Sequence, residues 1–135
     1  MRKGPVGMGR RMFRLDYDAG TNILTIQVKG FWTRDMVPAF SGALMQQARA
    51  LQDAGRAFDV LVESLEFPVQ SNEVADLMTN VMAAGFAFTA GRSAVVVGSQ
   101  LNKLQAERTL VHPRLRVFRA VDQAKAWLAA PAPQP

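Results

Sequence analysis

The stretch that decides the fold runs from Phe58 to Met78 and reads FDVLVESLEFPVQSNEVADLM. It starts with a short apolar run that ends on Glu63, which is typical of a buried strand. A polar loop follows, and Ser71 then precedes apolar residues at helical spacing, so we expect this serine to cap a helix. A strand joined to a helix in this way places the Ser71 hydroxyl at the carboxyl end of a sheet, where open α/β sheets usually bind ligands and partners.

The rest of the chain alternates between strand and helix patterns. Two period-two patterns come first, and the turn residues from Asp18 to Asn22 join them into a predicted hairpin. Thr33 is expected to cap the first helix, which then stops at Gly55. In order, the pattern predicts strands at 13–17, 23–28, 58–63, 94–97 and 115–118, and helices at 34–54, 72–85, 100–111 and 121–130.

This order, β-β-α-β-α-β-α-β-α, predicts an α/β fold with a mainly parallel five-stranded sheet and an N-terminal antiparallel hairpin. Within the helix at 100–111, four residues repeat in register along one face: Leu101, Leu104, Arg108 and Val111. At 135 residues the chain is expected to form one domain, from 12 to 130. Residues 1–11 are expected to be a flexible basic tail, and 131–135 a Pro-rich tail.

The net charge of +5 is concentrated at one end of the chain. Arg2, Lys3, Arg10 and Arg11 lie within the first eleven residues, and the remaining basic residues nearly balance the acidic ones. A basic arm of this kind can touch phosphate backbones, but it is more often a solvated terminus. We therefore expect no specific nucleic-acid partner.

The chain contains no cysteine and only one histidine, His112. Disulfides and thiolate metal sites are excluded, and no metal or other cofactor is expected. No apolar run is long enough to span a bilayer or to act as a secretory signal, so the expected location is the cytoplasm.

The element order resembles the STAS and anti-sigma-factor-antagonist fold, and in particular its divergent bacterial, SpoIIAA-like members. Three segments carry the resemblance: GFWT at 30–33, VLVE at 60–63 and RVFRAVDQAKAWL at 116–128. The resemblance implies a non-enzymatic regulatory or protein-interaction module with a protein partner. In that family a serine or threonine before a helix is phosphorylated by a partner kinase, which controls partner binding.

Carried over to this chain, the resemblance puts Glu63 at the acidic position and Ser71 at the switch position, with Asn72 and Glu73 beside it. The segment QSNE at 70–73 lacks the glycine of the family motif. A helix cap alone also explains Ser71, because serine followed by acidic residues is a common helix start.

Two other functions stay open from the residues. Methionine and aromatic side chains cluster around the first two helices, and MAAGFAF at 82–88 is apolar for longer than one helix face requires. This favours a small apolar or lipid-like ligand, or self-association as a homodimer, with candidate residues Trp32, Met78, Met82, Phe86 and Phe88. A third hypothesis is a small hydrolase or transferase that uses His112 with Ser71 or Glu63, which requires hydrogen-bond contact between them.

Overall fold

In the part of the chain that the structure describes, five strands and four helices follow one another in the predicted order. The computed structural model describes residues 12–131. The strands are β1 (Phe13–Asp18), β2 (Ile23–Lys29), β3 (Asp59–Glu66), β4 (Ser93–Val97) and β5 (Leu115–Phe118). The helices are α2 (Met36–Asp53), α3 (Asn72–Gly85), α4 (Gln100–Thr109) and α5 (Val121–Ala129). The basic tail expected at 1–11 lies outside the described residues.

The strands form one sheet in the order β1-β2-β3-β4-β5. β1 pairs antiparallel with β2, whereas β2, β3, β4 and β5 pair parallel with their neighbours. All carboxyl ends of the four parallel strands therefore meet at one edge of the sheet. The predicted α/β fold, a mainly parallel sheet with an antiparallel hairpin, is confirmed.

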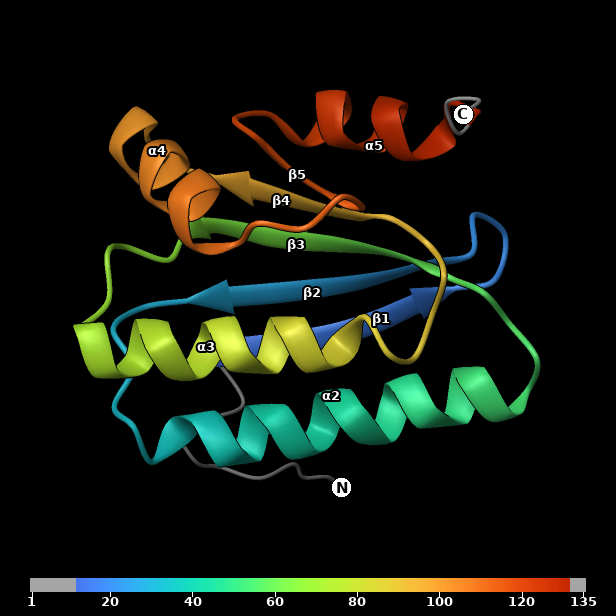
Figure 1. The fold of residues 1–135 in the computed structure, drawn as a ribbon, viewed down its shortest axis with the longest axis horizontal. Coiled ribbons are helices and arrows are strands. Elements are labelled where there is room, and N and C mark those ends of the chain that lie inside the picture. Colours follow the sequence, from blue (N-terminus) through green and yellow to red (C-terminus); the bar gives the residue numbers. More distant parts are fainter. Residues whose placement is uncertain (1–11, 132–135) are drawn as a thin grey trace, which may run out of the picture.

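Helices cover both faces of the sheet (Figure 1). The larger core lies between the sheet and α2 and α3, and it is built around Leu24, Ile26 and Phe40. From α4, only Ala106 and Leu110 at its end pack against this core. The smaller core lies on the opposite face, where Ala124 and Leu128 of α5 pack against the sheet.

Several predicted boundaries differ from the structure by one to three residues, among them the end of β3 and the start of α2. Strand β3 continues through Glu66, three residues beyond the predicted end at Glu63, because Glu66 still pairs with Lys29 of β2. Helix α2 begins after Asp35 instead of Thr33, and the Asp35 side chain makes no capping hydrogen bond. The carbonyl of Thr33 accepts a turn hydrogen bond from the N–H of Met36. The N–H groups of the first helical turn have no intrahelical partner, so Pro38 fits at the third helical position.

The outward face of α4 is the largest departure from expectation. Leu101 and Leu104 share a face as predicted, but their exposed fractions are 67% and 55%. Val111 lies beyond the end of the helix and is 80% exposed. No residue of α4 is buried. The helix therefore turns its apolar face to solvent and its other face toward the sheet.

Candidate functional site

Ser71 caps α3, as predicted. Its hydroxyl oxygen accepts a hydrogen bond from the backbone N–H of Val74 at 3.2 Å, and its carbonyl accepts one from Ala75 at 2.9 Å. The serine itself is exposed at the carboxyl edge of the sheet. The cap therefore depends on a side chain that a partner or a modifying enzyme can also reach.

The acidic residues predicted around Ser71 occupy different surroundings. Glu73 lies in the first turn of α3, and its carboxylate pairs with the Arg34 guanidinium at 3.1 Å on an exposed surface. Asn72 is exposed beside it. Glu63 lies on the face of the sheet opposite α3, where it accepts a hydrogen bond from the Gln27 amide at 2.9 Å. The structure therefore groups Ser71, Asn72 and Glu73 and separates Glu63 from them.

Gln70 ties the loop before α3 to the segment that leads into α2. Its carboxamide oxygen accepts a hydrogen bond from the backbone N–H of Trp32 at 2.8 Å. Its nitrogen donates to the carbonyls of Gly30 at 2.9 Å and Pro68 at 2.7 Å. The two segments are therefore held side by side, although they lie about forty residues apart in the sequence.

This arrangement exposes two apolar side chains next to Ser71. Phe31 is 73% exposed and lies between Gly30 and Trp32, which both bond to Gln70. Val69 is 42% exposed and lies between Gln70 and Pro68. We call Phe31, Val69, Ser71 and Glu73 the carboxyl-edge surface. Neither Phe31 nor Val69 belongs to a core cluster, so core packing does not explain their apolar character.

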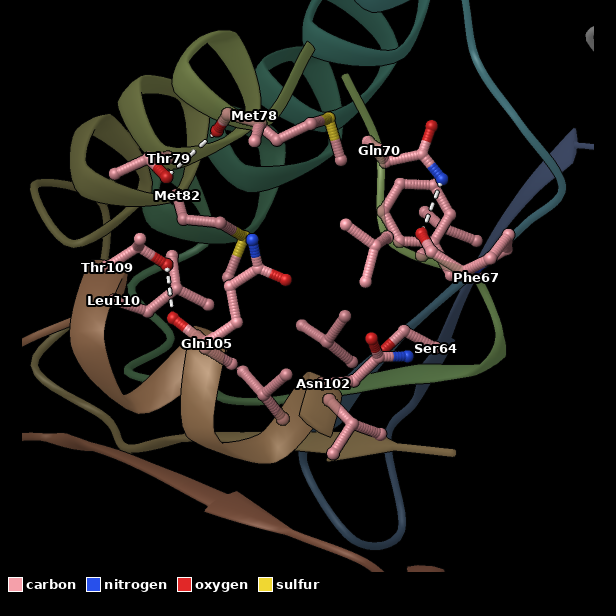
Figure 2. A pocket seen from close by; sticks show the side chains of 18 of the residues that line it. Ser64, Phe67, Gln70, Met78, Thr79, Met82, Asn102, Gln105, Thr109 and Leu110 are labelled. Atoms are coloured by element: carbon pink, nitrogen blue, oxygen red, sulfur yellow. Dashed lines mark hydrogen bonds between the residues drawn. The ribbon is translucent and has the colours of Figure 1, made fainter. Parts of the chain in front are cut away.

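An apolar cleft opens between α3 and α4 beside this surface (Figure 2). Its volume is about 150 Å³. Its floor consists of strand residues, and side chains of α3 and α4 line its two sides, with Phe67 and the 68–70 loop at one end. The lining includes Val62, Val95 and Val97 from the strands, Met78, Thr79 and Met82 from α3, and Asn102, Gln105 and Thr109 from α4.

Two of the five predicted apolar-site residues, Met78 and Met82, line this cleft. The others lie elsewhere. Trp32 is 5% exposed, its ring packs on Phe40, and its indole N–H donates to the Lys29 carbonyl. Phe86 stacks on His112 and Phe88 packs against the larger core, both near the opposite edge of the sheet.

His112 is not brought to Ser71 or Glu63. Its ring stacks on Phe86 at a centroid distance of 3.7 Å, and its Nδ1 accepts a hydrogen bond from the N–H of Arg114. Phe86 follows the C-terminal end of α3 and Ser71 precedes its N-terminal end. At about 1.5 Å per residue the helix separates them by roughly 20 Å. The proposed pairing of His112 with Ser71 therefore has no geometric basis.

The three carboxamide residues at the cleft were not predicted as functional. Gln70 follows Pro68 and Val69, while Asn102 and Gln105 lie three residues apart on α4. A helix-spaced polar pair usually marks a solvated face, so the sequence carries no signal that sets it apart. Within residues 12–131, no helix is long and apolar enough to span a membrane, and no cluster of three His, Asp or Glu side chains could hold a metal ion.

No family model matches the chain, and no curated protein matches its sequence. Solved structures do match. An anti-sigma factor antagonist from Mycobacterium paratuberculosis superposes with a TM-score of 0.63 at 12% identity, over 88% of this chain and 94% of that one. An uncharacterised protein with a SpoIIAA-like fold from Shewanella loihica PV-4 also superposes with a TM-score of 0.63, at 16% identity, over 87% of this chain and 92% of that one.

These likenesses define the class of structure. The chain has the SpoIIAA-like fold, since each superposition covers most of both chains. The resemblance read from the sequence is therefore confirmed at the level of the fold.

Proposed function

We propose that this protein is a non-enzymatic regulatory or protein-interaction module that binds its partner through the carboxyl-edge surface. The observation that carries the proposal is the exposure of Phe31 and Val69 beside the exposed helix cap Ser71. Aromatic side chains such as Phe31 are enriched at protein interfaces, and Val69 adds apolar area beside it. The fold adds support, because one similar structure is an anti-sigma factor antagonist.

The Gln70 contacts make this surface suitable for recognition. They hold the Phe31 and Val69 segments together before any partner arrives, so binding costs less conformational entropy than ordering two free loops. A phosphate on Ser71 would gain from the N-terminus of α3 but would meet the carboxylate of Glu73. Arg34, which pairs with Glu73, offers the compensating positive charge.

The proposal is tested by affinity purification of the tagged chain from its own cells, with quantitative mass spectrometry, and by sedimentation velocity of the purified chain. Phe31→Ser and Val69→Ser should each remove the same bound protein, or should weaken self-association. Leu104→Ser is the matched control, because it changes an exposed leucine on α4 outside this surface. The proposal would be contradicted if neither edge variant changed the set of bound proteins and the purified chain sedimented as a monomer.

The cleft favours a second candidate function, the binding of a small ligand with a mainly apolar body. A volume of about 150 Å³ is enough to hold a molecule the size of benzene. Met78 and Met82 on its wall adapt to ligands of varied shape. Ala75→Met should narrow the cleft, whereas Ala83→Met on the exposed side of α3 should not. Native mass spectrometry of the purified chain should show a co-purifying ligand that only Ala75→Met removes. The same added ligand mass in all three proteins, or none in any of them, would contradict this function.

A further inference from the structure

Helix α4 has its polarity reversed with respect to the core. A helix that covers a sheet normally turns its apolar side chains inward and its polar ones to solvent. In α4, Leu101 and Leu104 face out, while Asn102, Gln105 and Thr109 line the cleft. The polar side of the helix therefore lies opposite the methionine side chains of α3 (Figure 2).

Most polar groups of the cleft already have a hydrogen-bond partner within the protein. The Ser64 hydroxyl donates to the Val96 carbonyl at 2.6 Å. The Thr79 and Thr109 hydroxyls donate to helix carbonyls at 2.9 and 3.0 Å. The carboxamide of Gln70 is occupied by its three backbone contacts. None of these groups needs a ligand.

The carboxamides of Asn102 and Gln105 are different. Both side chains are half-buried at the cleft, and neither makes a hydrogen bond to any other described residue. A carboxamide offers two donors and one acceptor. Beside an apolar floor these two groups can hold a molecule that presents its own donor and acceptor along one edge.

The charge of the cleft restricts the ligand further. Among the described residues, no charged side chain lines the cleft, and the nearby Lys103 is paired with Glu107 on α4 at 2.9 Å. A carboxylate or phosphate placed over the apolar floor would lose its hydration without gaining a cation. A neutral ligand avoids this cost.

We propose that the cleft between α3 and α4 binds a neutral molecule with a flat apolar body and an amide-like edge. The apolar body lies against Met78, Met82 and the strand valines. The carboxamides of Asn102 and Gln105 read the edge, donating to its carbonyl and accepting from its N–H. This inference rests on the second candidate function and names the chemistry of its ligand.

The experiment uses three probes of matched shape: 4-fluorobenzamide, 4-fluorobenzoate and fluorobenzene. Their affinities for the full chain are measured by fluorine NMR, and the methyl signals of Met78 and Met82 report whether a probe occupies the cleft. We expect 4-fluorobenzamide to bind about tenfold more tightly than fluorobenzene, the gain of roughly one well-placed hydrogen bond. The benzoate should bind most weakly.

Asn102→Leu and Gln105→Leu should each reduce the preference for the amide several-fold while fluorobenzene still binds. Leu104 is next to Gln105 in the sequence but lies on the outer face of α4, so Leu104→Gln should leave all three affinities unchanged. Thermal unfolding of each variant verifies that it is folded. These variants separate a direct reading of the amide edge from a general disturbance of α4.

Each contrary result has its own meaning. Suppose that fluorobenzene shifts the methionine signals but 4-fluorobenzamide binds no more tightly, or binds more tightly to the same degree in both leucine variants. The proposed ligand chemistry is then overturned, and ligand binding at the cleft stands. If the benzoate binds best, the neutral ligand is overturned. If no probe shifts either methionine signal at millimolar concentration, the cleft is not a ligand site, and the second candidate function falls with the inference.

Discussion

The carboxamide of Gln70 accepts a hydrogen bond from the backbone N–H of Trp32 at 2.8 Å, and this contact holds together the two segments of the carboxyl-edge surface. Gln70→Ala removes it together with the bonds to Gly30 and Pro68. Because half-buried backbone groups lose their partners, we expect a loss of about 1–3 kcal/mol in the free energy of unfolding. Urea denaturation measures it, and the exposed Gln46→Ala on α2 should change little; equal effects of the two variants would contradict the role of Gln70.

Ser71 and Ser99 form a matched pair of helix caps. The hydroxyl of Ser71 accepts from Val74 N–H at 3.2 Å, and that of Ser99 accepts from Asn102 N–H at 3.1 Å. Ser71→Ala and Ser99→Ala should therefore each cost about 1 kcal/mol of stability. Only Ser71→Ala should also change partner capture or phosphate incorporation, since only Ser71 belongs to the carboxyl-edge surface. If Ser99→Ala abolishes capture to the same degree, the effect is one of stability and not of recognition.

The outward apolar face of α4 predicts that polar substitutions there change the stability of the protein very little. Leu101→Gln and Leu104→Gln should each change the free energy of unfolding by less than about 0.5 kcal/mol, because both side chains are mostly exposed. Leu44→Ala on α2, whose side chain is 5% exposed, should cost about 2–5 kcal/mol. Chemical denaturation compares the three variants. A cost for the α4 leucines close to that of Leu44 would mean that this face is covered in solution.

Arg114 holds the loop between α3 and β4. Its guanidinium donates to the carbonyls of Thr89 at 2.7 Å and Gly91 at 2.9 Å and lies over the Phe86 ring. Arg114→Met keeps much of the packing but removes these charge-assisted bonds, so we expect a loss of roughly 1.5–3 kcal/mol in thermal or denaturant unfolding. The exposed Arg119→Met is the control, and a similar loss in both variants would contradict the assignment.

Asp18 gives the stability a component that depends on pH. Hydrogen bonds from the Thr21 side chain and the Gly20 backbone hold the pKa of its carboxyl below the ordinary value. The folded state thus favours the ionised form, and this stabilisation is present above the unfolded pKa of about 3.9 and is lost as the pH falls through the folded pKa. The difference in stability between wild type and Asp18→Asn should therefore shrink below about pH 4. A difference that stays constant from pH 7 to pH 3 would contradict this account.

The element order and the cap at Ser71 were predictable because both depend on local interactions. Strand patterns and the turn from Asp18 to Asn22 depend on residues that are neighbours in the chain. The same holds for the cap, because Ser71 accepts a hydrogen bond from the N–H of Val74, three residues later. Parallel pairing followed from the alternation of strands and helices after the hairpin, since a helix between two strands supplies the crossover that parallel neighbours need.

The end of β3 was harder to predict, because it depends on a partner strand. Glu63, Leu65 and Glu66 do not continue an apolar run, yet β2 still supplies hydrogen bonds to the backbone beyond Glu63. The longer strand then obeys its own alternation. Val62 and Ser64 face the cleft, and Glu63 faces the opposite side, away from Ser71.

By itself, the sequence determined the type and order of the helices and strands, their bounds to within about three residues, and that Leu101 and Leu104 share a face of α4. Only the tertiary structure decided that Leu101 and Leu104 turn outward and that Asn102 and Gln105 turn inward. The physical reason is that periodicity defines a face without defining its direction. The direction depends on how α4 is attached at both ends: Gly98 before it, where any side chain would collide with the Leu65 carbonyl, and Leu110 after it, packed on the core.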